Sequence, residues 1–259
     1  MLYAIGDQHA RLDLVLKMYQ DILDDIEKVQ DPLGAEIIWL GDMVDRGPDA
    51  KGVLDFLYDI NFKDTNNLKH ICLLGNHEQL MADAWHGRMG SYHMWIDNGG
   101  SKTIKSFGLY KTYNSVVQSS ILEPYVRWIE NLPFYYEKYD YIFCHSGWVC
   151  ADDLKIPLDQ QKEQLIWGRP SLDRYKGSTK IVVCGHSPME RPHCADNLIN
   201  VDLGVGYGGC NTLACAVLPH GKCTESDVRF ILTHVAPKSI PKVQQEFTGE
   251  FPIGVVDSE

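Results

Sequence analysis

Five short polar segments in this 259-residue sequence place Asp, Asn or His at the end of an apolar run. They are Gly6-Asp7-Gln8-His9, Gly41-Asp42-Met43-Val44-Asp45-Arg46-Gly47, Gly75-Asn76-His77-Glu78, Phe143-Cys144-His145-Ser146-Gly147 and Cys184-Gly185-His186-Ser187-Pro188. Each segment alone is typical of a turn or a loop, because Gly tolerates unusual backbone angles and Asp hydrogen-bonds to nearby amides. In combination they offer nitrogen and oxygen donors from Asp7, His9, Asp42, Asn76, His145 and His186.

This donor set is typical of a metal centre with two ions. Carboxylate, amide and imidazole donors suit Mn²⁺, Fe or Zn²⁺ better than they suit a soft metal in a thiolate site. The donors are too many for one tetrahedral ion, whereas a pair of ions that shares a bridging carboxylate would use all of them. Two metals about 3.5–4 Å apart can activate a bridging water and stabilise both the attacking and the leaving oxygen. The sequence therefore predicts a dinuclear metal centre.

The apolar runs before these segments have the length of strands. The first three are Leu2–Ile5, Ile37–Leu40 and His70–Leu74, and each is followed by a stretch with the apolar spacing of an amphipathic helix. Successive strand–helix units predict an α/β sheet, and open sheets of this kind place ligands at the carboxyl ends of their strands. The polar segments stand at those ends.

A second, more antiparallel sheet is predicted from later apolar runs that lack long helices between them. These runs are Tyr141–Cys144, Ile181–Cys184, Leu198–Asp202, Thr212–Leu218 and Val228–Thr233. Residues 85–132 are predicted to form a helical cap beside the site. We expect a single domain over residues 1–240, with the cap as an insertion, and a polar C-terminal tail over residues 241–259.

Composition excludes some functional classes. With 24 basic and 35 acidic residues the net charge is −11, which argues against a general nucleic-acid binder. Phosphorylated substrates remain compatible, because the charge of bound metals can override the overall field. No apolar run reaches the ~18 residues of a membrane span, and the N-terminus does not resemble a signal peptide. We expect a cytoplasmic protein with reduced cysteines and no membrane partner; the oligomeric state stays open.

The five segments, in this order, resemble the signature of calcineurin-like metallophosphoesterases, especially the compact bacterial and phage serine/threonine phosphatases of the phosphoprotein phosphatase family. Asn200-Val201-Asp202-Leu203-Gly204, followed by Tyr207-Gly208-Gly209, resembles the C-terminal signature of that branch. The resemblance spans about residues 1–220. It implies a two-sheet β-sandwich flanked by helices, with a small helical cap.

The resemblance also implies a role for each donor. The implied ligands are Asp7 and His9 for the first metal, Asp42 as the bridge, and Asn76, His145 and His186 for the second metal. The cofactors would be two divalent ions, Mn²⁺ in the first place, with Fe or Zn²⁺ as alternatives. A metal-bridging hydroxide would then attack the phosphorus directly.

Other residues are implied in proton transfer and phosphate binding. His77 would be the general acid for the leaving alkoxide, oriented and kept protonated by Asp45, because a nearby negative charge favours the imidazolium. Arg46 would hold phosphate oxygens together with Asn76, since a planar guanidinium matches phosphate well. A second arginine is usual in this branch. Arg169 is assigned to that role from Leu165-Ile166-Trp167-Gly168-Arg169, and Arg174 is its competitor.

Two further segments bear on the resemblance. The family usually has glycine after the first histidine, where this chain has Ala10, and the extra methyl could narrow the approach to the first metal. The segment Asn98-Gly99-Gly100, with Thr103, is familiar from small bacterial members and is interpreted as cap structure rather than chemistry. The aromatic group Trp128, Phe134, Tyr135 and Tyr136 is interpreted as core or cap packing.

The predicted function is hydrolysis of phosphomonoesters on proteins, at serine or threonine and also at tyrosine. Its partner would be a phosphoprotein or a small phosphoester. The alternative is symmetrical cleavage of diadenosine tetraphosphate by a related branch, which often lacks the carboxylate before the arginine and has GNHD in place of GNHE. Asp45 and Glu78 favour the protein phosphatase. A catalytically inactive binding scaffold is the third reading, but no ligand is missing.

Overall fold

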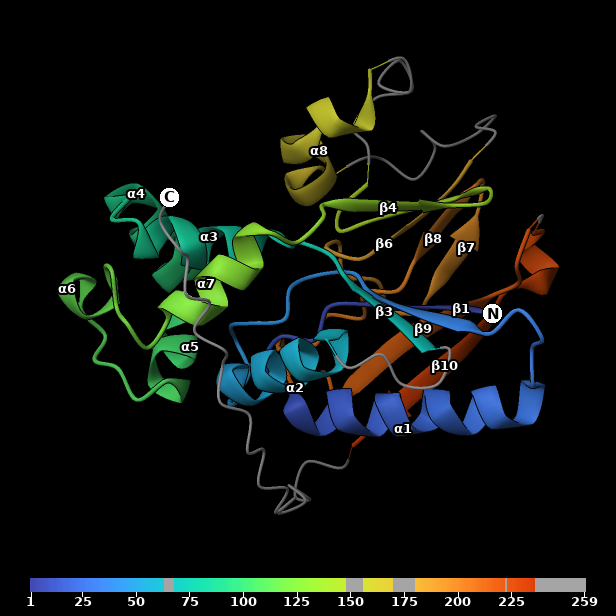
Figure 1. Cartoon of the computed structure of the whole chain (residues 1–259), viewed down its shortest axis with the longest axis horizontal. Coiled ribbons are helices and arrows are strands. Elements are labelled where there is room, and N and C mark those ends of the chain that lie inside the picture. Colours follow the sequence, from blue (N-terminus) through green and yellow to red (C-terminus); the bar gives the residue numbers. More distant parts are fainter. Residues whose placement is uncertain (63–67, 148–155, 170–179, 222, 236–259) are drawn as a thin grey trace, which may run out of the picture.

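The apolar runs of the first half form a parallel set of strands in the computed structural model of the chain (Figure 1), which describes residues 1–62, 68–147, 156–169, 180–221 and 223–235. Strand β1 (Leu2–Ile5) pairs in parallel with β2 (Ala35–Trp39), and β2 pairs in parallel with β3 (Leu68–Cys72). Their carboxyl ends therefore share one edge. Two C-terminal strands, β9 (Thr212–Leu218) and β10 (Arg229–His234), complete the sheet in the order β10-β9-β1-β2-β3.

The second sheet has the order β4-β5-β6-β8-β7. Its strands are β4 (Tyr135–Lys138), β5 (Tyr141–Cys144), β6 (Ile181–Cys184), β7 (His193–Ala195) and β8 (Leu198–Asn200). Strands β5, β6 and β8 are parallel, whereas β4 and β7 pair antiparallel at the two edges. A second sheet occurs as predicted, but it is mixed rather than mainly antiparallel. Two of the runs assigned to it were placed wrongly, because β9 and β10 pair in the first sheet.

Side-chain alternation in the strands divides the core into layers. In β1, Leu2 and Ala4 face the second sheet, while Tyr3 and Ile5 face the helices on the other side. This follows from the two-residue period of a strand, which sends neighbouring side chains to opposite faces. Tyr141 and Phe143 of β5 complete the layer between the sheets. The result is the two-sheet sandwich flanked by helices that the sequence predicted.

Two long helices cover the outer face of the first sheet (Figure 1): α1 (Leu12–Val29) and α2 (Ala50–Phe62). The buried side of α1 carries Leu14, Val15, Met18 and Ile22. These positions follow the three- and four-residue spacing of an amphipathic helix. On the second sheet, the short turn η3 (Leu158–Gln160) precedes helix α8 (Lys162–Trp167), which packs Leu165 on the outer face.

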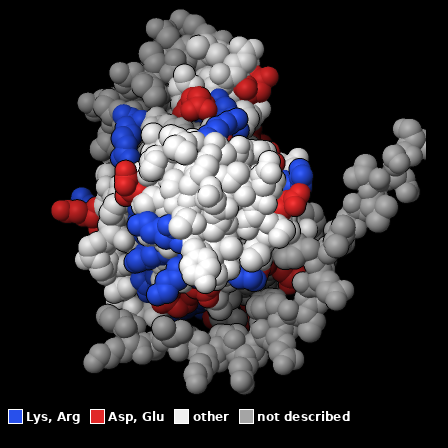
Figure 2. All heavy atoms as spheres, turned by 90° about the vertical axis from the view of Figure 1, so that its left-hand side faces the viewer, with Lys and Arg blue, Asp and Glu red and all other residues white. Residues whose placement is uncertain are grey.

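Residues 85–132 form the predicted helical cap. Helix α3 (Asn76–Trp85) leads into α4 (Met89–Trp95), the turn η1 (Ile96–Gly100) and α5 (Ser101–Ser106). The segment ends with α6 (Tyr113–Val116) and α7 (Glu123–Glu130). Figure 2 shows this helical side of the molecule, where a broad uncharged area is bordered by Lys, Arg, Asp and Glu.

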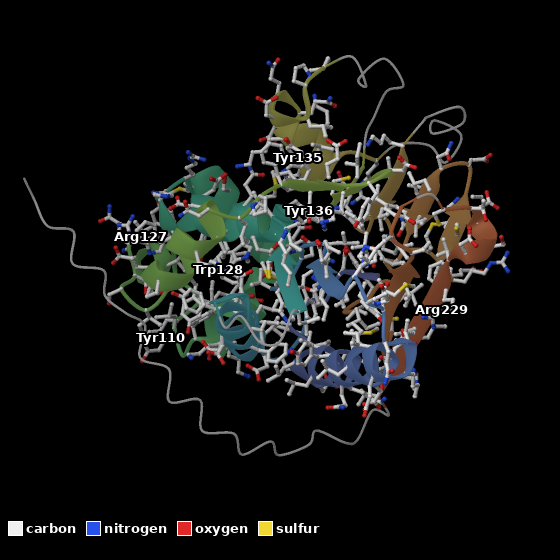
Figure 3. All side chains as sticks on the ribbon, turned by 45° about the vertical axis from the view of Figure 1, so that its right-hand side comes forward. Tyr110, Arg127, Trp128, Tyr135, Tyr136 and Arg229 are labelled. Atoms are coloured by element: carbon white, nitrogen blue, oxygen red, sulfur yellow. The ribbon has the colours of Figure 1, made fainter. Side chains whose placement is uncertain are left out.

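The predicted strands occur, with shifts of one or two residues at some ends, and two further strands were not predicted. Tyr135 and Tyr136 lie in β4, and β7 is a short edge strand. Figure 3 shows Trp128 on α7 and the two tyrosines on β4, so the predicted aromatic group comes from different elements. Tyr136 stacks on Phe143 with ring centres 6.1 Å apart, which is the packing role expected of it.

The short turn η5 (Glu225–Asp227) precedes β10 near the C-terminal end of the described chain. The predicted tail over residues 241–259 lies outside the described residues. Within the described residues, none of the helices combines the length and the apolar character needed to cross a bilayer.

Candidate metal centre

The strand ends bring the predicted donors into one buried cluster. Asp7 follows β1, Asp42 follows β2, and Asn76 begins α3 shortly after β3. His145 and His186 follow β5 and β6, so the second sheet contributes the remaining donors beside His9. All of these side chains are at most 7% exposed. Residues far apart in the sequence therefore converge at the edge where the parallel strands of both sheets end.

Backbone carbonyls fix the orientation of two histidines. His9 Nδ1 lies 3.0 Å from the carbonyl oxygen of Val44, and His145 Nδ1 lies 2.8 Å from that of Leu40. In each neutral ring Nδ1–H then donates to the carbonyl, which leaves Nε2 as an unprotonated lone pair. Metal-ligating histidines are usually oriented by such an outer hydrogen bond.

His145 Nε2 points at other acceptors, whereas His9 Nε2 lies near a carboxylate and also faces the guanidinium of Arg46. His9 Nε2 lies 3.6 Å from Asp42 Oδ2, and His145 Nε2 lies 3.0 Å from Asn76 Oδ1 and 3.1 Å from His186 Nδ1. Lone pairs that face one another in a buried site repel unless a positive charge lies between them. The donor chemistry fits a pair of divalent cations.

Two groups of possible ligand atoms share one residue. His9, Asp42 and His77 form one group, and Asp42, His145 and His186 form the other, with all ligand atoms of a group within 4.8 Å of one another. The shared residue is Asp42, which the sequence predicted to be the bridge. His186 Nε2 is also buried without a hydrogen-bond partner among the described residues. Such an orphaned polar atom is rare in a packed interior.

Electrostatics in the cluster favour added positive charge. Burial lowers the pKa of His145, but the nearby carboxylate of Asp42 outweighs it and raises the pKa to about 10. Burial lowers the pKa of His9 well below its usual value, and burial together with the charge of Asp202 raises that of Asp7. Closely spaced carboxylates and imidazoles thus attract a proton or a cation, because two buried like charges destabilise each other.

Glu78 organises the loop that carries Asp42. Its carboxylate accepts hydrogen bonds from the backbone amides of Asp42 at 2.8 Å, Met43 at 2.7 Å, Val44 at 3.2 Å and Gly75 at 3.0 Å. The side chain is fully buried, and burial with the negative charge of Asp42 raises its pKa to about 7. Glu78 therefore connects the segment after β2 to the start of α3.

His77 and Asp45 form a buried pair beside the cluster. His77 Nδ1 lies 2.6 Å from Asp45 Oδ2, and both side chains are at most 1% exposed. Burial lowers the pKa of His77, but the charges of Asp42 and Asp45 outweigh it, so the pKa is raised overall. Two cap residues also contact Asp45: Trp95 Nε1 donates to both carboxylate oxygens at 2.9 Å, and Thr103 Oγ1 donates to Oδ1 at 2.6 Å.

Arginine side chains lie at the open side of the cluster. Arg46 contacts His9 Nε2, and its guanidinium lies 3.9 Å above the ring of Tyr207. Burial and the charge of His145 lower the pKa of His186 to about 3, and the charge of the exposed Arg169 contributes. Arg169 follows the C-terminal end of α8, and its role in phosphate binding remains a prediction; its competitor Arg174 lies outside the described residues.

Much of the site backbone adopts the left-handed region. The non-glycine residues with positive φ at the cluster are His9, Ala10, Asp42, Asp45, Arg46 and His186, with φ between 41° and 70°. Each such residue costs about 1–3 kcal/mol and persists only where its surroundings enforce the conformation. Ala10 has φ 53°, which explains why glycine is usual at this position.

Several residues at the site were missed by the sequence analysis. Thr103 was assigned to cap structure alone, but it contacts Asp45, and Trp95 was not singled out at all. Asp202 and Tyr207 appeared only as parts of a signature, yet Asp202 is 2% exposed beside Asp7, and Tyr207 covers Arg46. A tryptophan and a threonine in a helical segment carry no distinct signal in the sequence.

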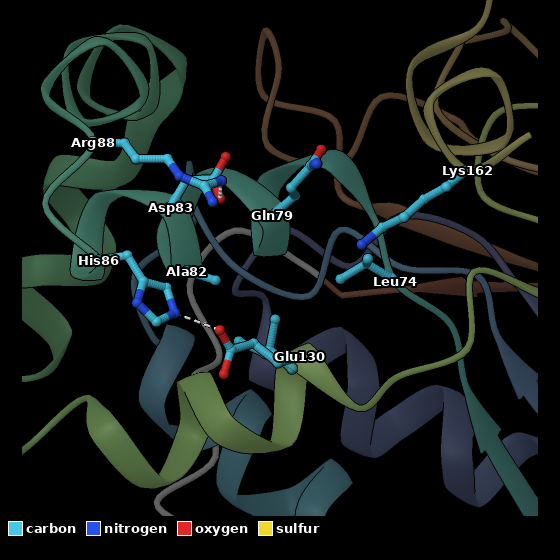
Figure 4. Close-up of a pocket in the computed structure, with 9 residues that line it drawn as sticks. Leu74, Gln79, Ala82, Asp83, His86, Arg88, Glu130 and Lys162 are labelled. Carbon is cyan, nitrogen blue, oxygen red and sulfur yellow. Dashed lines mark hydrogen bonds and ion pairs between the residues drawn. The ribbon is translucent and has the colours of Figure 1, made fainter. Parts of the chain in front are cut away.

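A second polar region lies between α3, α7 and α8 (Figure 4). This groove has a volume of about 500 Å³ and is lined by residues such as Gln79, His86, Glu130 and Lys162. His86 pairs with Glu130, but these side chains are 43% and 37% exposed. The groove lacks the converging buried donors of the cluster, so it is not the candidate metal site.

Comparison with known proteins agrees with this arrangement. The family model described as calcineurin-like phosphoesterase matches residues 2–214. Among curated relatives, the asymmetrical bis(5'-nucleosyl)-tetraphosphatase PrpE of Bacillus mycoides is 25% identical over 228 residues, which cover 82% of each chain. The protein of the same name from a Geobacillus species is 26% identical and covers 70% of this chain and 75% of its own.

Solved structures share the fold at low sequence identity. A protein serine/threonine phosphatase from Saccharomyces cerevisiae, with similarity to human phosphatase PP5, has a TM-score of 0.61 and 15% identity; the match covers 92% of this chain and 81% of that one. A cold-active protein-tyrosine phosphatase of a psychrophilic Shewanella has a TM-score of 0.55 and 15% identity, covering 83% and 74%.

Proposed function

The chain belongs to the calcineurin-like phosphoesterase family, and we propose that it is a metal-dependent phosphatase that acts on phosphoserine and phosphothreonine in proteins, with phosphotyrosine as a further substrate. The observation that carries this proposal is the buried pair of His77 and Asp45 beside the donor cluster. A serine or threonine alkoxide is a strongly basic leaving group, so its departure needs a proton donor.

The proposed metal ligands are those predicted from the sequence. They are Asp7 and His9 for one ion, Asp42 as the bridge, and Asn76, His145 and His186 for the other. Support comes from the convergence of their lone pairs and from the outer hydrogen bonds of His9 and His145. The metal pair, when bound, supplies an activated water and stabilises charge on the phosphoryl group.

His77 is proposed to deliver the proton to the leaving oxygen from Nε2. Its Nδ1 is engaged by Asp45 at 2.6 Å, and its Nε2 lies 3.7 Å from Asp42 Oδ2, on the side of the cluster. Burial lowers the pKa of His77, but the charges of Asp42 and Asp45 raise it overall, which favours the protonated ring that the role requires. Arg46 and Arg169 are proposed to hold the phosphate oxygens, because a guanidinium presents a planar set of donors.

A second candidate is hydrolysis of dinucleoside tetraphosphates. The curated relatives from Bacillus and Geobacillus carry that activity in their names, at 25% and 26% identity. The chemistry of the leaving group separates the two candidates. A nucleotide leaves as a weakly basic phosphate, for which a buried general acid brings little advantage, whereas an alkoxide depends on it.

The first experiment compares His77→Ala with the native chain on two phosphomonoesters in the presence of Mn²⁺. For a phosphoserine peptide we expect kcat to fall about 100-fold or more, since general acid catalysis contributes about 10²–10⁴. For 4-nitrophenyl phosphate, whose leaving group is weakly basic, the loss should be at least tenfold smaller. His86→Ala serves as the control, because it removes a partly exposed histidine at the other end of α3.

Equal losses of kcat on both substrates would show that His77 is not the general acid.

The second experiment compares kcat/KM for the phosphoserine peptide with that for diadenosine tetraphosphate. A higher value for the peptide supports the protein phosphatase. A higher value for the dinucleotide, with ATP and AMP as products, would transfer the proposal to the asymmetrical tetraphosphatases.

A further inference from the structure

We propose that Trp95 and Thr103, both in the helical cap, are positioning residues that hold Asp45, and through it His77, in the geometry needed for proton donation. The proposal rests on the proposed acid role of His77. It assigns part of the catalytic geometry to a segment that lies outside the strands carrying the metal donors. The cap would thereby take part in catalysis rather than only cover the site.

The first argument is the hydrogen bonding of the Asp45 carboxylate. Its two oxygens accept from Trp95 Nε1 at 2.9 Å each, from Thr103 Oγ1 at 2.6 Å, and face His77 Nδ1 at 2.6 Å. Asp45, Trp95 and Thr103 are each fully buried. A carboxylate with a single partner could rotate about its side-chain bonds. Three partners from different directions fix its plane, and hence the direction in which the imidazole of His77 points.

The second argument is the backbone of the dipeptide Asp45-Arg46. Both residues have positive φ, 70° and 64°, which is an unfavourable conformation for residues with a β-carbon. The cap supports this conformation at several points. The amide of Asp45 donates to Thr103 Oγ1 at 2.9 Å, and Lys102 Nζ donates to the carbonyl of Arg46. Thr103 therefore accepts from the backbone and donates to the side chain of the same residue.

The third argument is the shape of the cap at this contact. Gly99 interrupts the turn η1 with φ 106°, and a β-carbon there would lie 2.9 Å from Arg46 Cγ and 3.0 Å from Arg46 N. A β-carbon on Gly100 would lie 2.6 Å from the indole of Trp95. The two glycines thus allow the turn to approach both Arg46 and the ring of Trp95. Irregular turns inside helical segments are often found at functional sites.

The test uses the dependence on the leaving group, which a general loss of folding would not change. Thr103→Val removes the hydroxyl with little change of shape, and Trp95→Phe removes the indole donor. For each variant we expect kcat on a phosphoserine peptide to fall about tenfold or more, whereas kcat on 4-nitrophenyl phosphate changes less than about threefold. KM should change little on both substrates, because neither residue is proposed to touch the substrate.

Two further variants serve as controls. Thr103→Ser retains the hydroxyl and should restore the native ratio of the two kcat values. Ser106→Ala removes a comparable contact of the cap, in which Ser106 Oγ accepts from the amide of Lys51 at 2.8 Å, without touching Asp45. Its ratio should remain that of the native chain. Thermal melting and bound Mn²⁺ per chain are measured for every variant.

The outcomes separate this proposal from the proposed function. If His77→Ala shows the selective loss but Thr103→Val and Trp95→Phe lose both activities equally, or lose neither, the positioning role is wrong while the acid role stands. If His77→Ala itself shows no selectivity, the proposed function fails first. The two cap variants each remove one donor to the carboxylate of Asp45. Should Trp95→Phe not fold, the comparison of Thr103→Val with Thr103→Ser decides.

Discussion

Two polar regions adjoin helix α3, and they differ in what holds their side chains. In the donor cluster every side chain is buried, and backbone carbonyls accept hydrogen bonds from Nδ1 of His9 and of His145. In the groove between α3, α7 and α8, His86 and Glu130 pair with each other at the surface, and both remain partly exposed. The groove does not lack charged groups, since Asp83, Arg88 and Lys162 also line it. The candidate site is therefore distinguished by buried donor atoms held in fixed directions, and not by the number of its charged groups.

The largest effect is expected at the residue that both groups of donors share. Asp42→Asn should lower Mn²⁺ affinity and turnover by at least about 100-fold, the upper end of what removal of an outer partner of a ligand costs. The loss of affinity is measured as the metal content after dialysis, and the loss of turnover as kcat at saturating Mn²⁺. Removal of metal with a chelator should abolish turnover of the native chain. If Asp42→Asn keeps its metal and its activity, the cluster is not the metal site, and the contrast with the groove is wrong.

Glu78→Gln tests whether the loop of the cluster depends on its buried carboxylate. The amide can accept at one oxygen only, so two of the four backbone amides lose their acceptor. Leaving two buried donors unpaired should cost about 2–6 kcal/mol in the free energy of unfolding. Urea denaturation with and without Mn²⁺ measures this change. Glu163→Gln, at an exposed position of α8, is the matched control and should shift stability by less than about 0.5 kcal/mol.

A smaller effect is expected where the backbone of the cluster is left-handed. Ala10→Gly relieves a positive φ of 53° but loses a buried methyl, so the two contributions oppose each other and stability should stay within about 1 kcal/mol of the native value. Ala4→Gly in β1 loses a buried methyl without such relief, and should destabilise by about 1–2 kcal/mol. Thermal melting compares them. An equal loss in both variants would show that the backbone at Ala10 stores no strain.

The smallest effect is expected in the groove. His86→Ala and Glu130→Gln each remove one partner of an exposed ion pair, which contributes little because water screens it. Each should change stability by less than about 0.5 kcal/mol and leave kcat/KM for a phosphoserine peptide within about twofold. A tenfold loss of kcat/KM would mean that the groove contacts the substrate, and the contrast between the two regions would then be wrong.

The donors could be predicted from sequence because each stands shortly after the end of a strand. Apolar runs locate strands, and parallel strands end at a common edge, so Asp7 and Asp42 had to lie close together once the first sheet formed. The fold class followed from the same runs. The assignment of individual ligands remains a prediction, and so does the extent of the single domain.

Residues that act from other elements could not be predicted in the same way. Trp95 and Thr103 lie about fifty residues beyond Asp45 in the sequence, within short helices whose packing no periodicity specifies. Glu78 was noted as part of a motif, but its contacts with four amides depend on how two loops meet. The strands β4 and β7 were missed because each is short and lies at a sheet edge, where the apolar pattern is weak.

The donors come from both sheets, and the stability of the folded chain should therefore depend on bound metal. Asp7 and Asp42 follow strands of the first sheet, whereas His145 and His186 follow strands of the second. On the proposed assignment, the cations would fasten the two halves of the sandwich to each other. A ligand at 100 times its dissociation constant adds about 2.7 kcal/mol to the folded state. The concentration of free metal would then determine the stability of the folded protein as well as its turnover.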